Sequence, residues 1–530
     1  MPTLVCVPIT VAEVHSALDA AHLAQAKGAD LVEYRIDTFF SGSGDAEEQA
    51  GVLKLVRESP LPCVVTCRPT WEGGDYDGDD MERVSLFERL GTSDEPGERP
   101  RYLDVELAAL TRSANLRQKV NLAVDHPKQV RDLSTSLILS SHDFEGRPPD
   151  LTRRLLAMAD EDSCKVAKLA YRARSLRDNL DVFDLLRQAR DLGKPAIALA
   201  MGEFGLMSRV LAPKFGAFLT FASLRDESAT APGQPTIDEL LGRYRFSTIG
   251  ASTRLYGVIG WPVAHSRGPE IHNAAFESAE WDGVYLPLPI AADAGDAEGS
   301  DASFKATLLA LLHEPGLGFA GASVTLPHKE RLVALAEAEG WTISAPAAVC
   351  GAANTIVVER DAQGEIERVS IDNTDAPAAG TVLGEALDGL RGRRIVIIGA
   401  GGVARGVAAA CIAGGAQVSV HARRVEQAQR LADDLGPRDL SGWPGGALDG
   451  GTLEASSLDD LAEGTRECPD AYVNATPIGM SGGPDPEGVP LPTRVIEGSS
   501  EGCVFFDTVY TPRTTPMLAQ AAQAGRHTRD

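Results

Sequence analysis

Eight short apolar segments alternate with spacers of helix length in the N-terminal half, and a glycine-rich turn follows a later apolar run at Val396–Ile398. Strands and helices that alternate in this way are typical of a parallel sheet covered by helices. Eight such units within about 250 residues are the count of a closed barrel. The sequence therefore predicts an α/β protein, in which an N-terminal (β/α)8 barrel is followed by a two-lobed α/β region with a Rossmann-type nucleotide lobe.

The eight apolar segments are the predicted barrel strands. They are Leu4–Ile9, Leu31–Asp37, Cys63–Arg68, Tyr102–Glu106, Leu137–Asp143, Lys165–Ala170, Ala196–Met201 and Ala217–Phe221. Spacers such as Thr10–Lys27 and Leu176–Leu192 are long enough for helices. Because barrel strands are buried, charged residues at their ends are costly unless they are paired or used.

Breaks in the strand and helix pattern divide the chain into three predicted domains. The barrel pattern ends near Arg245–Thr253, and a new βαβ pattern begins at Arg393. The acidic stretch Ala291–Ser303, rich in glycine and alanine, is expected to be a solvated loop. The predicted domains are the barrel at residues 1–246, a substrate lobe at 254–375 and a nucleotide lobe at 376–530.

The composition argues against nucleic acid and membrane partners. The formal net charge of −25 repels phosphate backbones and anionic lipid. The N-terminus lacks a basic segment ahead of a long apolar run, and no apolar run reaches the roughly 18 residues of a membrane span. The eight cysteines show neither a CxxC pair nor zinc-ligand spacing. We expect a cytoplasmic protein with reduced thiols, no metal site and small-molecule partners.

Charged residues gather at the carboxyl ends of the predicted barrel strands, where catalytic groups of this fold lie. They are Glu33, Arg35, Arg68, Asp104, Glu106, His142 and Lys168. Lys168 stands in an apolar strand, where burial lowers the pKa of an amine and makes it nucleophilic. Taken alone, such a lysine usually extends to water, and a strand-end histidine is usually structural. Taken together, an amine and a nearby general base favour imine chemistry on a ketone.

The segment VIIGAGGVARG at Val396–Gly406 reads as a strand, a glycine-rich turn and the start of a helix. Such a turn lets the backbone approach a pyrophosphate, to which the helix N-terminus offers N–H donors. After the next predicted strand, Arg423 and Arg424 stand where NAD-selective sites usually have Asp or Glu. This favours the 2′-phosphate of NADP, the alternative being a solvated basic pair.

Seven motifs in order connect the first half with a known family. They are EYRID at Glu33–Asp37, TCR at Thr66–Arg68 with EGG at Glu72–Gly74, DVEL at Asp104–Leu107, SHDF at Ser141–Phe144, KLA at Lys168–Ala170, MGxxGxxSR at Met201–Arg209 and APGQ at Ala231–Gln234. Each motif is weak alone, but the ordered set resembles type I 3-dehydroquinate dehydratase. The resemblance implies an imine between Lys168 and the C3 ketone of 3-dehydroquinate.

The same resemblance implies roles for the other residues. His142 would remove the C2 proton and help expel the C1 hydroxyl as water, and Glu72 would orient His142. The implied substrate contacts are Glu33, Arg35 and Arg68 to ring hydroxyls, Arg209 to the carboxylate, and Thr230 and Gln234 in the segment that closes over it. Lys165 competes with Lys168 for the imine, but three residues away on a strand it faces the opposite side.

A second set of motifs resembles shikimate dehydrogenase, a two-lobed α/β dehydrogenase. They are GWPVAHSRGPEIHNAAF from Gly260, GASVTLPHK to Lys329, GAANT to Thr355, NTD at Asn373–Asp375, NATPIGM from Asn474 and DTVYTPRTTPML from Asp507. The resemblance implies an acid/base pair of Lys329 and Asp375. The implied contacts are Ser266, Thr325, Asn354 and Tyr510 to 3-dehydroshikimate or shikimate, and Gly399, Ala400, Gly401, Gly402, Arg423, Asn474 and Thr476 to NADP.

The two resemblances together imply a bifunctional enzyme for consecutive steps of the shikimate pathway, which leads to aromatic amino acids. Two departures from the family concern the second half. Gly268 stands where a second hydroxyl usually contacts the carboxylate, and the chain stops at Asp530, before the C-terminal segment expected in the family. The alternative reading is an active dehydratase joined to a degenerate, non-catalytic dehydrogenase-like domain.

Overall fold

The computed structural model describes residues 2–42, 46–95, 97–129, 134–225, 233–293, 295–436, 440, 442–444, 450–463 and 468–530. The predicted substrate residue Thr230 lies outside these residues. The chain forms two compact units, Met1–Phe319 and Ala320–Asp530.

An eight-stranded parallel barrel forms the N-terminal part of the first unit. Its strands are β1 (Leu4–Thr10), β2 (Leu31–Arg35), β3 (Cys63–Thr66), β4 (Tyr102–Glu106), β5 (Ser136–Asp143), β6 (Cys164–Arg172), β7 (Ala196–Met201) and β8 (Leu219–Phe221), in the order β7-β6-β5-β4-β3-β2-β1-β8. Where β8 meets β7, the Phe218 N–H donates to the Ala196 carbonyl at 2.8 Å. The eight predicted strands and the (β/α)8 barrel are confirmed.

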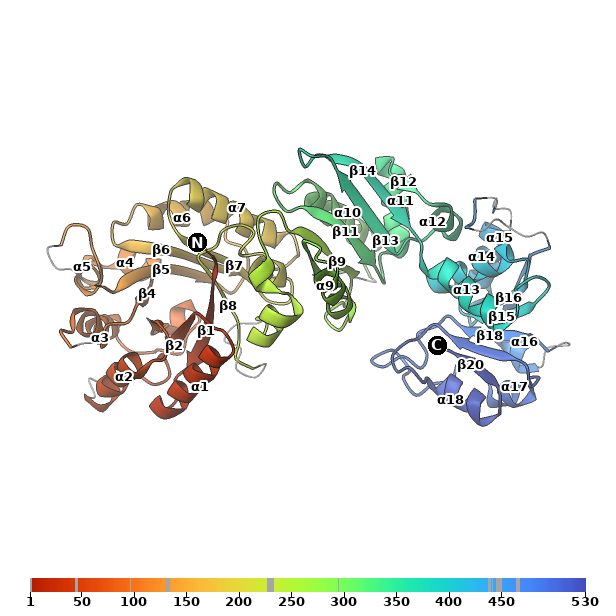
Figure 1. Cartoon of the computed structure of the whole chain (residues 1–530), viewed down its shortest axis with the longest axis horizontal. Helices are drawn as coiled ribbons and strands as arrows, with labels where there is room; N and C mark the ends of the chain where they lie inside the picture. The colour runs from red at the N-terminus through yellow and green to blue at the C-terminus, as the bar shows by residue number, and fades with distance from the viewer. Residues whose placement is uncertain are drawn as a thin grey trace. The chain divides into compact units, whose positions relative to one another are not determined.

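Helices lie around the outside of these strands (Figure 1). They are α1 (Val14–Ala26), α2 (Ala46–Glu58), α3 (Asp80–Thr92), α4 (Leu107–Arg112), α5 (Ala114–Ala123), α6 (Leu151–Ala159), α7 (Asp178–Asp191) and α8 (Leu206–Val210). The short helical turns η1 (Thr70–Glu72), η3 (Glu239–Arg243) and η4 (Phe246–Thr248) complete this part of the chain.

The next six strands form a mixed sheet. They are β9 (Arg254–Gly260), β10 (Gly283–Pro289), β11 (Phe319–Val324), β12 (Thr342–Ile343), β13 (Thr355–Arg360) and β14 (Ile366–Asp372), in the order β10-β9-β11-β13-β14-β12, with α9 (Gly268–Ser278), α10 (Ala297–His313), α11 (Lys329–Glu339) and α12 (Ala345–Cys350) between them. The loop predicted at Ala291–Ser303 is wrong in part, since α10 begins at Ala297. Asp296 caps this helix by accepting the Gly299 N–H at 2.9 Å, and Ser300 is buried within it.

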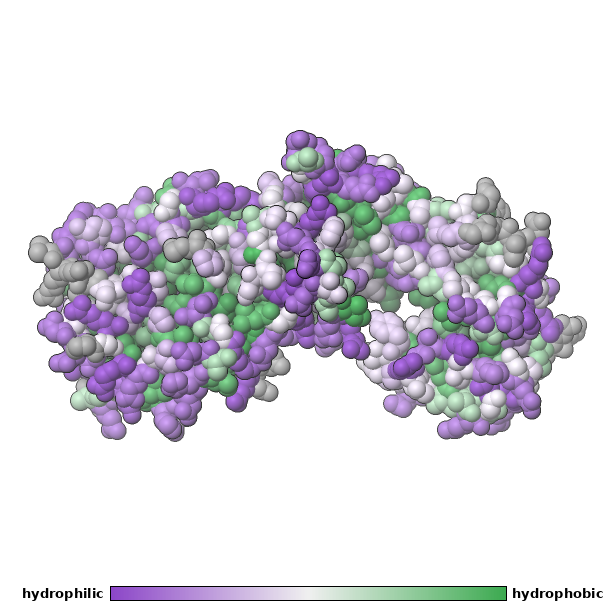
Figure 2. Space-filling view, in the orientation of Figure 1, coloured by the Kyte–Doolittle hydropathy of each residue, from purple (hydrophilic) through white to green (hydrophobic). Residues whose placement is uncertain are grey.

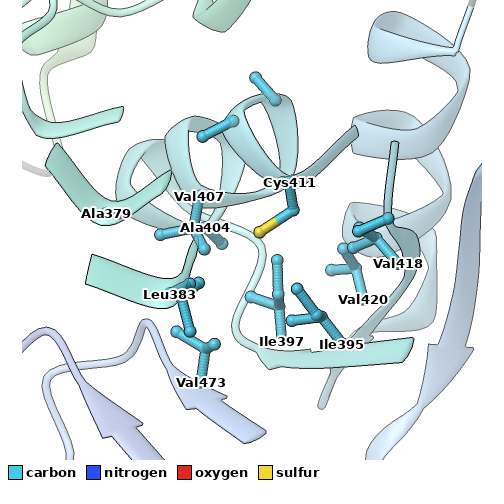
Figure 3. Packing of buried hydrophobic residues seen from close by; sticks show 14 of the residues in the cluster. Ala379, Leu383, Ile395, Ile397, Ala404, Val407, Cys411, Val418, Val420 and Val473 are labelled. Atoms are coloured by element: carbon cyan, nitrogen blue, oxygen red, sulfur yellow. The ribbon is translucent and has the colours of Figure 1, made fainter. Parts of the chain in front are cut away.

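The last six strands form a parallel sheet of the predicted Rossmann type. They are β15 (Arg394–Ile398), β16 (Gln417–Ala422), β17 (Thr452–Ser457), β18 (Ala471–Asn474), β19 (Val504–Asp507) and β20 (His527–Arg529), in the order β17-β16-β15-β18-β19-β20. Alternate residues of β15 pack into two different apolar cores, one on each face of the sheet. Ile395 and Ile397 pack with α13 (Asp375–Ala386), α14 (Gly402–Ala413) and α15 (Val425–Leu435) (Figure 3). Val396 and Ile398 pack with α16 (Leu458–Glu463), α17 (Thr493–Gly498) and α18 (Pro516–Gln523).

Hydrophilic side chains cover much of the face seen in Figure 2, in keeping with the net charge of −25. All eight cysteines are free thiols, and every one except Cys468 is buried. Within the described part of the chain, no helix is both long and apolar enough to cross a membrane. The same residues contain no group of three or more His, Cys, Asp or Glu side chains placed to hold a metal ion.

Candidate active sites

A buried polar layer lies near the carboxyl ends of the barrel strands. One apolar core cluster includes Leu31, Val64, Tyr102, Ile138 and Val166. Two residues further along the same five strands stand Glu33, Thr66, Asp104, Ser140 and Lys168, and all are buried. Because side chains two apart on a strand share a face, these residues point the same way as the apolar cluster. The interior of the barrel therefore ends in a polar site.

Lys168 is the amine of this layer. Its Nζ lies 2.8 Å from Asp104 Oδ2 and 3.5 Å from Glu33 Oε1, and it stands 4.7 Å from the centre of the Phe221 ring. Lys165 on the same strand is exposed, so the pleat separates the two lysines as predicted. Lys168 is buried in its apolar strand, and two carboxylates from other strands offset the cost of burying its charge.

Arg68, which follows β3, contacts residues of two further strands, β4 and β5. Its guanidinium donates to Asp104 Oδ1 at 2.7 Å, to Glu106 Oε1 at 2.6 Å and to Ser140 Oγ at 2.8 Å. Burial raises the pKa of Asp104, but Arg68 and Lys168 outweigh burial and hold this pKa well below its ordinary value. Asp104 is therefore ionised, with one oxygen toward Arg68 and the other toward Lys168.

Glu72 and His142 form a second pair. Glu72 Oε1 accepts the His142 backbone N–H at 2.9 Å and lies 3.0 Å from its Nδ1. Burial raises the pKa of Glu72 to about 8, although Arg68 opposes the rise. Burial, followed by the charges of Arg68 and Lys168, lowers the pKa of His142, so its ring is neutral at neutral pH. Once Glu72 is ionised, it can accept Nδ1–H of this neutral ring, which leaves Nε2 available as a base.

Arg209, Arg35 and Gln234 are the remaining predicted contacts of this site. Arg209 stands on α8 and is 1% exposed, and its Nε and Nη2 have no hydrogen-bond partner among the described residues. Burial lowers its pKa to about 10. Arg35 is paired with Asp37 through two bonds of 2.8 and 2.9 Å, and Gln234 is buried. The buried guanidinium of Arg209, which has no such partner among the described residues, is suited to bind a carboxylate through two hydrogen bonds.

No role is predicted from the sequence for Asp104, Glu106, Ser140 or Arg83. Asp104 and Glu106 could have been found from the sequence, since each is a charged residue at the end of an apolar strand. Arg83 could not, because it stands on α3. Its ion pair with Glu106 at 2.6 Å and its bond to the Cys67 carbonyl at 3.0 Å arise only when α3 packs on the barrel.

In the second unit, the structure brings Lys329, Asn354 and Asp375 together. Lys329 begins α11, Asp375 begins α13, and Nζ lies 2.5 Å from Oδ2. Asn354 accepts the Thr374 backbone N–H and donates to the Thr374 hydroxyl, both at 2.9 Å, which places it beside the ion pair. Thr325 follows β11 and is half-buried.

Ser266 and Tyr510 lie in different units. Ser266 precedes α9, and its Oγ accepts the Gly268 N–H at 3.2 Å. A Cβ on Gly268 would come within 2.9 Å of the Tyr285 ring, so that ring fills the space beside the missing side chain. Tyr510 follows β19 and is 81% exposed.

The glycine-rich turn lies between β15 and α14. Gly399 has a φ of +112°, and a Cβ there would stand 2.7 Å from the Ala475 carbonyl oxygen, so only glycine fits. Gly401 precedes α14 without a side-chain cap. The first N–H groups of this 12-residue helix are therefore directed at the turn formed by Ala400, Gly401 and Gly402, with the positive end of the helix dipole.

Asn474 and Thr476 shape the neighbouring loop. Asn474 donates to Asp507 Oδ1 at 2.9 Å and to the Ile478 carbonyl at 3.1 Å, and it accepts the Thr476 hydroxyl at 2.7 Å. These bonds occupy the buried amide and hold the loop after β18. Arg423 follows β16 with an exposed side chain.

Comparison with known proteins covers both halves. Residues 5–251 match the model of type I 3-dehydroquinase, and residues 258–356 match that of the shikimate dehydrogenase substrate binding domain. The chloroplastic bifunctional 3-dehydroquinate dehydratase/shikimate dehydrogenase of Arabidopsis thaliana is 31% identical over 99% of this chain and 78% of its own length. A shikimate dehydrogenase (NADP(+)) of Anaeromyxobacter dehalogenans is 38% identical over 52% of this chain and 85% of its own. A 3-dehydroquinate dehydratase of Methanosarcina mazei is 34% identical over 42% of this chain and 87% of its own.

A barrel with a buried lysine at its rim, joined to a two-lobed α/β region with a lysine–aspartate pair, defines an α/β enzyme with a candidate site in each half. The chain belongs to the family of bifunctional 3-dehydroquinate dehydratase/shikimate dehydrogenases. The family resemblance predicted from the motifs is confirmed.

Proposed function

We propose that the barrel dehydrates 3-dehydroquinate through a Schiff base on Lys168 and that the second half reduces the product to shikimate with NADPH. The observation that carries the proposal is the buried Lys168 amine, held between Asp104 and Glu33 at the polar end of the barrel. We assign dehydration to residues 1–246, binding of the second substrate to 254–375 and NADP binding to 376–530.

In the first reaction, the Lys168 amine, after losing a proton, adds to the C3 carbonyl, and loss of water gives an iminium. The ionised Asp104 faces this nitrogen and stabilises its positive charge. The iminium acidifies C2, so His142 removes a C2 proton to give an enamine. The enamine electrons then expel the C1 hydroxyl, which takes the proton from His142 and leaves as water. Hydrolysis of the product imine frees Lys168.

The remaining residues of the barrel site would position the substrate. Arg209 would bind the carboxylate, because it is a buried cation without an acidic partner among the described residues. The ring hydroxyls would contact Glu33, Arg35 and Arg68. Gln234 would close over the site, and the Thr230 hydroxyl would contact the substrate.

In the second reaction, NADPH, when bound, supplies a hydride to the carbonyl carbon of 3-dehydroshikimate. Lys329 would protonate the carbonyl oxygen, and Asp375, 2.5 Å away, would hold and recharge this lysine. Ser266, Thr325, Asn354 and Tyr510 would bind the substrate. Gly399 to Gly402 fit a pyrophosphate, since the backbone is bare there and α14 lacks a side-chain cap. The intact ion pair favours an active reductase over a degenerate domain.

A coupled assay on the purified chain tests both activities. With 3-dehydroquinate alone, we expect ultraviolet absorption of the conjugated product to rise, and adding NADPH should then start its oxidation. A rise in absorption without NADPH oxidation would contradict the second activity. The absence of both signals would contradict both activities.

The rate of dehydration should rise with pH through about 8. Burial raises the pKa of Glu72 to about 8, so its carboxyl is protonated below this pH and ionised above it. Only the ionised form accepts Nδ1–H of His142 and leaves Nε2 unprotonated. Glu72→Gln should lower kcat by about 10- to 100-fold, less than the loss of a full general base, and should remove the rise. Profiles of kcat/KM from pH 5.5 to 9.5 measure this. A rise that persists in the variant would assign it to another group.

Replacing Arg423 with alanine should weaken the binding of NADPH much more than the binding of NADH. A hydrogen bond to a charged phosphate supports about a 10- to 100-fold rise in the KM for NADPH, and NADH lacks that phosphate. Arg430, exposed on the following helix, is the matched control, and its alanine variant should keep both KM values. Equal losses for the two cofactors in the Arg423 variant would count against a 2′-phosphate contact.

A further inference from the structure

A tryptophan of the dehydrogenase half contacts a loop of the barrel within the first compact unit. Trp261 directly follows β9, and Phe204 lies between β7 and α8. The two rings are stacked, with centroids 5.3 Å apart and an interplanar angle of 8°. Both side chains are half-buried. The loop that carries Phe204 follows the carboxyl end of a barrel strand, so the contact lies at the catalytic rim of the barrel.

Hydrogen bonds connect Phe204 with Arg209. The Phe204 carbonyl accepts from Asn179 Nδ2 at 2.7 Å, and Asn179 Oδ1 accepts the Ser208 backbone N–H at 3.0 Å. The Ser208 hydroxyl donates to the Gly205 carbonyl at 2.8 Å. Arg209 is the next residue, so its backbone position depends on where this loop lies.

The same loop supports the segment that leads to Gln234. A Cβ on Gly233 would stand 2.1 Å from the Gly202 carbonyl oxygen, so the two backbones are in direct contact. Gly205 is equally confined, since a Cβ there would stand 2.3 Å from the Ala200 carbonyl oxygen. Loop 202–205 is thus packed against the segment of Arg209, proposed to bind the carboxylate, and against the segment of Gln234, proposed to close over the site.

Other contacts join the barrel to the following residues away from this loop. Arg187 on α7 pairs with Glu314 at 2.7 Å, and Lys214 donates to the carbonyls of Ala251 and Thr253 at 2.8 and 2.7 Å. These bonds do not involve Trp261. Removing its ring therefore leaves the parts of this unit attached and acts mainly on loop 202–205.

We propose that Trp261 is a positioning residue for the dehydratase reaction. Its ring braces Phe204 and thereby holds Arg209 and Gln234 in place for the substrate. A residue of the second half thus sets substrate affinity in the first site. This inference rests on the proposed role of Arg209 in binding the carboxylate.

Steady-state dehydration by the full-length chain tests the proposal. Trp261→Ala should raise the KM for 3-dehydroquinate by about 3- to 10-fold, the range that an aromatic pair supports, and should leave kcat within about twofold. Trp261→Phe, which keeps a ring, should restore most of the loss. Phe204→Leu removes the same stack from the barrel side and should raise KM equally. Trp281→Ala is the matched control, since this exposed tryptophan of the same unit lies away from the loop in sequence, and its KM should not change.

The Arg209→Lys variant tests the proposed role of Arg209 separately from the proposed role of Trp261. If this variant leaves KM unchanged, the proposed role of Arg209 fails, and the positioning inference fails with it. If it raises KM while the Trp261→Ala and Phe204→Leu variants do not, the positioning inference alone is overturned. A fall in kcat at constant KM in the Trp261 variant overturns it too. If Trp261→Ala does not fold, Phe204→Leu and Trp261→Phe decide.

Discussion

Lys168→Ala should abolish dehydration, lowering kcat by more than about 10⁴-fold, because the variant lacks the amine that joins the substrate. Treatment of the wild-type chain with 3-dehydroquinate and borohydride should add the mass of a reduced adduct, and the variant should gain none. The fold should survive, since Asp104 keeps its bond of 2.7 Å to Arg68 after the ammonium is removed. Circular dichroism and NADPH-dependent reduction of 3-dehydroshikimate by the same preparation check this.

Lys165→Ala is the matched control on the same strand. Its side chain is exposed, on the opposite face of the pleat from Lys168. Trapping and dehydration should therefore stay within about twofold of the wild type, as expected for a surface substitution. Trapping lost in the Lys165 variant but kept in the Lys168 variant would reverse the assignment of the imine.

The proposed role of Arg209 would explain how an acidic chain binds an anion in the barrel. Arg68 is neutralised by Asp104 and Glu106, and Lys168 by Asp104 and Glu33. Arg209 differs, because it is buried without an ion pair among the described residues. In the proposed reaction, this one unneutralised cation would outweigh the net charge of −25, since interactions over longer distances are screened by salt.

Features of the chain that follow from local periodicity could be predicted. Alternation of apolar runs and spacers gave the eight barrel strands, and the period of two along β6 separated Lys168 from Lys165. The position of the glycine-rich turn between β15 and α14 likewise follows from its own strand and helix. These features depend on residues close in sequence, so a single chain reveals them.

Features that depend on packing between distant segments could not be predicted. The ion pair of Arg83 with Glu106 requires α3 to lie against the barrel, and the carboxylates around Lys168 come from other strands. From the sequence, Gly268 predicts only the loss of a hydroxyl that would contact the carboxylate. The structure adds that the Tyr285 ring, from β10, stands within 2.9 Å of the place where a Cβ would be.

Asp375→Asn should lower NADPH-dependent reduction of 3-dehydroshikimate by about 10²- to 10⁴-fold, the usual contribution of general acid–base catalysis. The amide cannot return a proton to Lys329 after the lysine has protonated the substrate, and the ion pair of 2.5 Å loses its negative partner. Dehydration should be unchanged, because the polar layer of the barrel contains neither residue. Both rates are measured on one preparation, with 3-dehydroquinate and 3-dehydroshikimate supplied separately.

Glu330→Gln, which removes an exposed carboxylate next to Lys329 in sequence, is the control for a general change in charge. It should keep both activities, because a solvated carboxylate contributes little to the ionisation of its neighbours. Equal loss of reduction in the two variants would show that net charge, and not the Lys329–Asp375 pair, governs the step. If dehydration fell together with reduction in Asp375→Asn, the two sites could not act separately, and the assignment of one reaction to each half would be wrong.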